Sequence, residues 1–149
     1  PVLDLSEPMS AKEAFRHFAA ALSEHLKLPE EELYEKLLER ESLASTVVHP
    51  GIAIPHVIVE GENTFGLLLA RHQEGIRFPK TEEPVQIVFV LAGSLDQRGH
   101  HLKSLMQIAH TVQEPDFEER WKAARGPEEL RDLVLMSTRK RQVRTESKL

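Results

Sequence analysis

Apolar residues recur at helical spacing in the first third of the chain. Ser10 and Glu13 form a capping-box pattern, in which each side chain can bond the other residue's backbone N–H, and this marks a helix start. Apolar positions then follow at steps of three and four residues, which predicts a helix over about 10–27. Pro29, followed by three glutamates, predicts a second helix that runs to about Arg40.

The middle of the chain has a different pattern. Two continuous apolar runs, TFGLLLARH and VQIVFVLAG, have strand length and predict central strands that are covered on both faces. The segment 43–59 before them is broken by Pro50-Gly51 and by Pro55, so it predicts short strands and turns.

Helical spacing returns after the second apolar run. HHLKSLMQIAHTV predicts a helix whose buried stripe consists of Leu102, Leu105, Met106, Ala109 and Val112. Asp116 with Glu119 predicts the cap of a short helix, and Gly126-Pro127 ends that helix and starts the last one. The alternation of elements predicts an α/β fold with a single domain, in which a mixed central sheet is flanked by α-helices on both faces.

Composition narrows the possible functions. The 149 residues suffice for one domain with a sizeable core. The absence of cysteine excludes disulfides and thiolate metal sites and fits a cytoplasmic location. No apolar run approaches the roughly 20 residues of a membrane span, so we expect no direct membrane insertion. The start at Pro1 rather than methionine is typical of a segment taken from a longer protein.

Charge is distributed unevenly. Residues 139–149 carry five Lys/Arg and one Glu, a net charge of +4, whereas residues 1–138 carry −9. We therefore expect a domain over 1–138 and a basic, disordered tail over 139–149. Contact of this tail with anionic lipid or RNA is the alternative. The acidic body argues against nucleic-acid binding, which needs a basic face.

Common catalytic motifs are absent. The chain has no Gly-rich phosphate loop, no GxSxG elbow and no HExxH motif. Among the histidines, His100 and His101 are adjacent and His110 lies nine residues after His101, which is poor spacing for a shared metal. The sequence thus predicts neither a metal site nor a cofactor.

Two histidines are placed in ways that suit anion chemistry. His56 follows Pro55, which fixes the local backbone and presents the imidazole in a defined direction, although a surface loop histidine would look the same. His101 lies at the start of a helix that follows a strand, where free N–H groups favour an anion. An imidazole with one free ring nitrogen can accept a phosphoryl group if donors surround the product.

Candidate donors precede His56. The guanidinium of Arg40 can pair with phosphoryl oxygens, and the hydroxyls of Ser45 and Thr46 can add single bonds. Each has an ordinary alternative, because Arg40 can be a cation at a helix end and Ser45 and Thr46 can belong to a turn. The individual residues leave these alternatives open.

Together, these residues form a known pattern. The stretch ERESLASTVVHPGIAIPH, residues 39–56, resembles the signature of the fructose/mannitol-type EIIA domains of the bacterial phosphoenolpyruvate-dependent phosphotransferase system. HLKSLMQIA, which begins at His101, resembles the helix that carries the family's second active-site histidine.

The resemblance implies specific roles. His56 would accept phosphate from phospho-HPr and pass it to an EIIB partner. His101 would neighbour it, Arg40 would steady the charge, and Glu41, Ser45 and Thr46 would shape the phosphate pocket. The family's fold is a mixed sheet flanked by helices, and no metal or nucleotide is required.

A second hypothesis comes from the longer stretches STVVHPGIAIPHVIVEGEN and FVLAGSLDQRGHHLKSL. They are similar to EIIA-like domains attached to the cytosolic ends of membrane transporters such as antiporters and permeases. Such a domain would regulate the transporter, with or without phosphorylation of His56. The sequence thus indicates either a catalytic phosphoryl carrier, a phosphotransferase, or a regulatory module tethered to a membrane protein.

Overall fold

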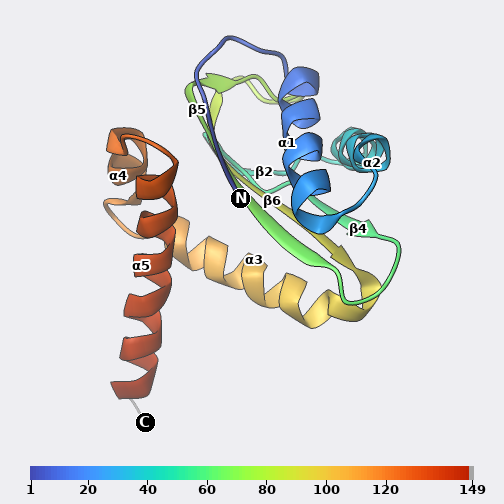
Figure 1. Cartoon of the computed structure of the whole chain (residues 1–149). Coiled ribbons are helices and arrows are strands. Elements are labelled where there is room, and N and C mark those ends of the chain that lie inside the picture. Colours follow the sequence, from blue (N-terminus) through green and yellow to red (C-terminus); the bar gives the residue numbers. More distant parts are fainter. Residues whose placement is uncertain (148–149) are drawn as a thin grey trace.

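A computed structural model gives the backbone of residues 1–147 and the side chains of residues 1–137 (Figure 1). In chain order, its elements are β1 (Val2–Leu5), α1 (Ala11–Leu26), α2 (Glu30–Leu43), β2 (Val47–His49), β3 (Ile52–Ala53), β4 (His56–Val59), β5 (Phe65–Ile76), β6 (Val85–Ser94), a 3₁₀ turn (Leu95–Gln97), α3 (Arg98–Val112), α4 (Phe117–Ala123) and α5 (Pro127–Ser147).

The sheet is organised around β6. Its strand order is β1-β5-β6-β3-β2, and β4 also pairs with β6, further along the same edge as β3. β5 and β6 are antiparallel, whereas β3 and β4 are parallel to β6, with Ile52 opposite Ile87 and His56 opposite Leu91. One edge of β6 therefore pairs with two successive short strands, and His56 begins the second of them.

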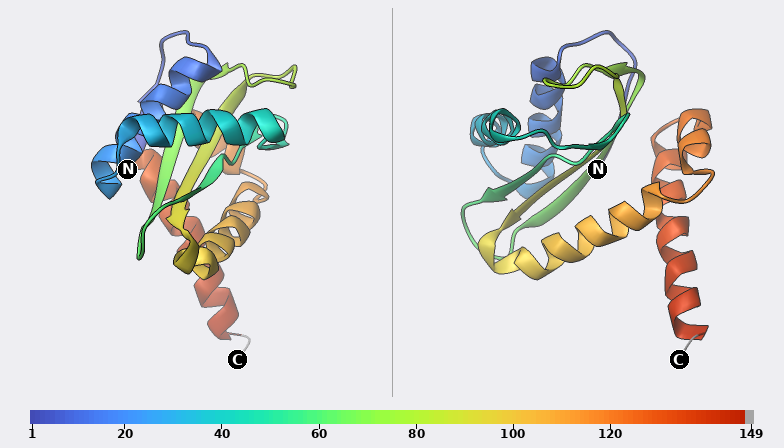
Figure 2. Two further views of the ribbon diagram at one scale, coloured as in Figure 1. Left: turned by 90° about the vertical axis from the view of Figure 1, so that its right-hand side faces the viewer. Right: turned by 180° about the vertical axis from the view of Figure 1, so that it is seen from behind.

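Helices cover both faces of this sheet. Helices α1 and α2 pack on one face, whereas α3, α4 and α5 lie on the other, as the view from behind shows (Figure 2). The continuous apolar sequences of β5 and β6 follow from this burial, because their side chains enter a core on each side. The predicted α/β fold with a mixed sheet in a single domain is confirmed.

The first two helices form as predicted. The Ser10 hydroxyl accepts a hydrogen bond from the Glu13 N–H at 3.2 Å, and the Glu13 carboxylate accepts one from the Ser10 N–H at 3.4 Å. The second helix ends at Leu43, three residues beyond the predicted end. This extension places Arg40 within the last turn of α2 rather than at its final residue.

The predicted buried stripe of α3 is only partly correct, since Leu105 and Val112 pack against the core and the other three residues are exposed. Leu102 and Met106 are 55% and 64% exposed, and the buried side chains are His101, Ile108 and Thr111. One residue of helix corresponds to about 100° of rotation, so a buried face that begins at His101 leaves Leu102 and Met106 in solvent. Apolar spacing could not identify this face, because two of its three buried residues, His101 and Thr111, are polar.

Three smaller features also differ. Asp116 makes no side-chain cap, because its carboxylate pairs with Arg120 at 2.9 Å. β1, which the sequence analysis did not predict, pairs in parallel with β5. Helix α5 continues to Ser147, where we expected a disordered tail from residue 139. Residues 148–149 and the side chains beyond 137 lie outside the described part of the chain, and the domain boundary at 138 stays a prediction.

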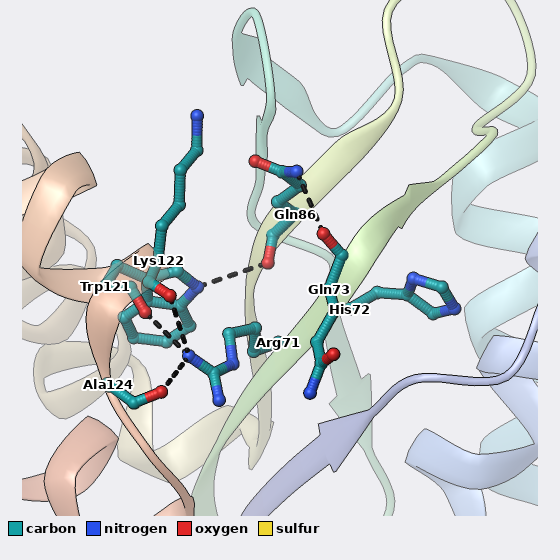
Figure 3. A pocket seen from close by; sticks show the side chains of 7 residues that line it. All are labelled: Arg71, His72, Gln73, Gln86, Trp121, Lys122 and Ala124. Atoms are coloured by element: carbon teal, nitrogen blue, oxygen red, sulfur yellow. Dashed lines mark hydrogen bonds between the residues drawn. The ribbon is translucent and has the colours of Figure 1, made fainter.

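A buried arginine ties the α4 end to the sheet. The Arg71 guanidinium forms a two-pronged ion pair with Asp4, at 2.6 and 2.9 Å, and donates to the backbone carbonyls of Trp121 and Ala124 (Figure 3). These carbonyls lie where α4 ends, where carbonyls lack the i→i+4 partners of a helix interior, although the Trp121 carbonyl also accepts the Ala124 N–H at 3.4 Å. Arg71 thus connects β1, β5 and the end of α4.

Loss of the Asp4 carboxylate leaves the buried Arg71 charge uncompensated. We expect Asp4→Ala to lower the free energy of unfolding by about 3 kcal/mol. Arg125→Ala removes an exposed ion pair with Glu129 and should change stability by less than about 0.5 kcal/mol. Urea unfolding of both variants measures the difference, and equal small losses would contradict a connecting role for Arg71.

Candidate functional site

The site is built around the break between β3 and β4. Pro55 interrupts the strand, and its carbonyl accepts a hydrogen bond from the Leu91 N–H at 2.9 Å. The chain regains the edge of β6 at His56, whose side chain is half-buried. Pro55 therefore interrupts the edge strand between β3 and β4, which both pair with β6.

The imidazole of His56 is held by the backbone just before it. Its Nδ1 lies 2.8 Å from the carbonyl oxygen of Ile54. A carbonyl can only accept, so Nδ1 carries the proton and donates it, and in the neutral ring Nε2 keeps its lone pair. One nitrogen is thus used for orientation and the other is left for chemistry.

Arg40 lies beside the free nitrogen. Its Nη2 is 3.4 Å from Nε2 of His56, and its Nη1 donates to the Ala44 carbonyl at 2.9 Å. A shallow cavity of about 290 Å³ opens here, and Lys36 also lines it. The sequence analysis missed Lys36, although its spacing of four residues from Arg40 places both on one helix face.

His101 completes a pair of imidazoles. Its ring centroid is 5.6 Å from that of His56, and the rings meet edge to face at 74°. Among the described residues, its Nδ1 is a buried side-chain atom without a hydrogen-bond partner. Burial lowers the pKa of His101 from its ordinary value near 6.5, and the neighbouring His56 lowers it further. Near neutral pH, His101 is therefore an uncharged ring next to the open nitrogen of His56.

The three remaining predicted residues are placed differently. Glu41 and Thr46 are buried and bonded to each other, with the Thr46 hydroxyl donating to the Glu41 carboxylate at 2.6 Å. Ser45 is exposed, and its hydroxyl accepts the Val47 N–H at 3.1 Å. The structure thus brings His56, Arg40 and His101 together. Glu41 and Thr46 form a separate, buried contact that does not line the cavity.

Another cavity, of about 240 Å³, lies next to Arg71 (Figure 3). The Trp121 indole donates to the Gln86 carbonyl at 3.2 Å, and the Arg71 guanidinium has the partners given above. His72 points away from this cavity and donates to the Glu7 carbonyl at 2.7 Å. These groups are occupied in holding the fold, so we assign no chemistry to them.

Within the described residues, no group of three or more His, Asp and Glu side chains is arranged to hold a metal ion. No described helix is both long enough and apolar enough to cross a bilayer.

Comparison with known proteins identifies the family. Residues 3–136 match the family described as phosphoenolpyruvate-dependent sugar phosphotransferase system, EIIA 2. The chain belongs to this EIIA family. The resemblance stated from the motifs at His56 and His101 is thereby confirmed at the level of the family.

Relatives and solved structures agree with this assignment. The EIIA chain is 31% identical to a nitrogen regulatory protein of Bradyrhizobium diazoefficiens, with 91% of this chain and 95% of the relative covered. It is similar to the crystal structure of the nitrogen regulatory protein IIA-Ntr from Neisseria meningitidis, with a TM-score of 0.80, 28% identity, and 89% and 91% of the two chains covered. A second solved structure, a complex of enzyme IIA and phosphorylated enzyme IIB for mannitol from Escherichia coli, shares the fold at a TM-score of 0.74 and 20% identity, with 90% and 93% of the two chains covered.

The lowered pKa of His101 predicts a pH effect on stability. Because the folded state binds this proton less readily than the unfolded state, the unfolding free energy should fall as the pH drops below about 6.5 and level off below the folded-state pKa. Urea unfolding at a series of pH values should show a smaller acid-side loss in His101→Gln. If NMR showed that His101 of the folded EIIA protein titrates at or above pH 6.5, the burial argument would be wrong.

Proposed function

We propose that this chain is a phosphoryl carrier in which Nε2 of His56 accepts and then donates a phosphoryl group. The observation that carries the proposal is the Nδ1 hydrogen bond to the Ile54 carbonyl, since it leaves Nε2 as the free nucleophile. Nε2 faces a cavity lined by Arg40, where an incoming phosphoryl group has access.

The transfer step balances without a proton donor. The Nε2 lone pair forms a bond to phosphorus while the P–N bond of the donor phosphohistidine breaks, and that bonding pair returns to the donor imidazole. The His56 ring gains positive character as it is phosphorylated, and the Nδ1–H bond to Ile54 stabilises this charge. This transfer between two imidazoles requires neither a metal ion nor a nucleotide.

The neighbours of His56 have separate tasks. Arg40 supplies a fixed positive charge 3.4 Å from Nε2, where the phosphoryl oxygens would lie. His101, which is uncharged before transfer and whose ring centroid lies 5.6 Å from that of His56, is proposed to offer an N–H to a phosphoryl oxygen. Lys36 adds a second positive charge to the same cavity, which Glu39 partly offsets. Glu41, Ser45 and Thr46 support this pocket in the proposal.

The proposed partners are phospho-HPr as donor and an EIIB protein as acceptor. Support comes from the family and from the solved complex of a mannitol enzyme IIA with phosphorylated enzyme IIB. Both exchanges are proposed to take place in the cytoplasm. The catalytic role is that of a phosphotransferase whose histidine carries the group between two other proteins.

A regulatory role is the second candidate. It is favoured by the 31% identity to a protein named nitrogen regulatory protein. In this proposal the phosphorylation state of His56 changes the binding of a target, because phosphate adds negative charge and acceptor oxygens to the site. The target can be a membrane transporter that carries this EIIA domain, as the sequence analysis also considered.

Phosphorylation with phosphoenolpyruvate, enzyme I and HPr tests the central step. We expect one phosphate per chain, labile in acid and stable in base. His56→Ala should abolish the label because the nucleophile is lost, and Arg40→Ala should slow labelling by at least about tenfold because the positive charge is lost. Electrophoresis and mass spectrometry follow the label.

His49→Ala provides the matched control, since it removes an exposed histidine from the nearby strand β2. It should label at the normal rate. Absence of label on the unmodified protein would reject the carrier role, and label that survives His56→Ala but not His101→Ala would reverse the site assignment. Transfer from the labelled domain to an EIIB protein separates the carrier from the purely regulatory module.

A further inference from the structure

A chain of hydrogen bonds beneath the site connects helix α2 to His56. It begins at Glu41, which is 5% exposed and lies on the inner face of α2. The two carboxylate oxygens of Glu41 lie 3.2 and 3.3 Å from the Thr46 backbone nitrogen, and one of them also accepts the Thr46 hydroxyl at 2.6 Å. Thr46 is therefore fixed through both its backbone and its side chain.

Thr46 passes this constraint to the segment before His56. Its carbonyl accepts the Ile54 N–H at 2.9 Å. The Ile54 carbonyl in turn accepts Nδ1–H of His56 at 2.8 Å. Pro55, which lies between Ile54 and His56, has no backbone N–H and so cannot donate a hydrogen bond that would fix this segment. The direction of the Ile54 carbonyl thus depends on the Thr46 contact on one side and on the pairing of Pro55 with Leu91 on the other.

We propose that Thr46, anchored by Glu41, is a positioning residue that keeps His56 in the Nδ1–H tautomer and keeps Arg40 beside Nε2. This inference rests on the proposed role of His56. Glu41 directly follows Arg40, so the bond from Glu41 to Thr46 joins the last turn of α2 to the segment just before β2. The same contact sets both the ring orientation and the distance from Arg40 to Nε2.

This role differs from a direct contact with phosphate. Thr46 is 2% exposed, and its hydroxyl already donates to Glu41. Thr46 is not among the residues that line the cavity beside Arg40. Its effect on phosphorylation comes through the Ile54 carbonyl. Loss of the hydroxyl should therefore change which ring nitrogen of His56 carries the proton. This tautomer can be measured without a phosphoryl donor.

The test compares Thr46→Val with Thr46→Ser. Valine keeps the shape and the backbone N–H but leaves the Glu41 carboxylate without its hydroxyl partner, whereas serine keeps the donor. Long-range proton–nitrogen NMR correlations give the His56 tautomer. We expect Nδ1–H to dominate in the unmodified protein and in Thr46→Ser, and Nε2–H to become detectable in Thr46→Val. The rate of labelling from phospho-HPr should fall at least about tenfold in Thr46→Val and recover to within about threefold in Thr46→Ser.

Thr111→Val is the control for a merely structural effect. Thr111 is also 2% exposed, and its hydroxyl donates to the Gln107 carbonyl at 2.9 Å within α3. This variant should lose stability in urea unfolding without a change in the His56 tautomer. An unchanged tautomer in Thr46→Val, or the same tautomer shift in Thr111→Val, would overturn the proposal.

The two proposals fail in different ways. If the unmodified protein accepts no phosphate while Thr46→Val still shifts the tautomer, the positioning role stands and the carrier role falls. If phosphate is accepted normally by Thr46→Val with the tautomer unchanged, the carrier role stands and the positioning role falls.

Discussion

The hydrogen bond from Nδ1 of His56 to the Ile54 carbonyl is the interaction on which the site depends. It decides which ring nitrogen is free, and it is made within three residues of the same chain segment. The fold supplies the conditions for it, since β3 and β4 both pair with β6 and Pro55 breaks the edge between them. A continuous strand would direct the His56 side chain by the pleat alone, without a carbonyl available to Nδ1.

Local positive charge distinguishes the site from the rest of an acidic protein. Residues 1–138 carry a net charge of −9, yet two cations, Arg40 and Lys36, line the cavity next to Nε2 against one carboxylate, that of Glu39. The lowered pKa of His101 keeps this neighbour of His56 uncharged near neutral pH. A phosphoryl group would reverse this balance, because its negative charge favours protonation of a neighbouring imidazole. This balance of charge is consistent with the proposed transient binding of a phosphoryl group.

Features that depend on local sequence were predictable. The capping box at Ser10, the helix start at Pro29 and the two apolar strands gave the main elements, and the motif around His56 led to the family. The proximity of Arg40, His56 and His101 was anticipated through the family resemblance, since 45 residues separate the two histidines and no local rule joins them.

Features that depend on tertiary packing were missed. The buried face of α3 includes His101 and Thr111, so apolar spacing selected a neighbouring stripe. The mutual burial of Glu41 and Thr46 could not be anticipated, because a Glu and a Thr five residues apart are usually exposed and become partners only where α2 ends against the strand. β1 was missed because its pairing with β5 spans more than 60 residues of sequence.

The most direct test of the account is the position of the phosphoryl group on the His56 ring. Phosphorus–nitrogen couplings in the ¹⁵N-labelled phosphoprotein identify the bonded nitrogen. The account predicts phosphate on Nε2 with the Nδ1 proton still donated to Ile54. Phosphate on Nδ1 would require that hydrogen bond to break, and it would contradict the account.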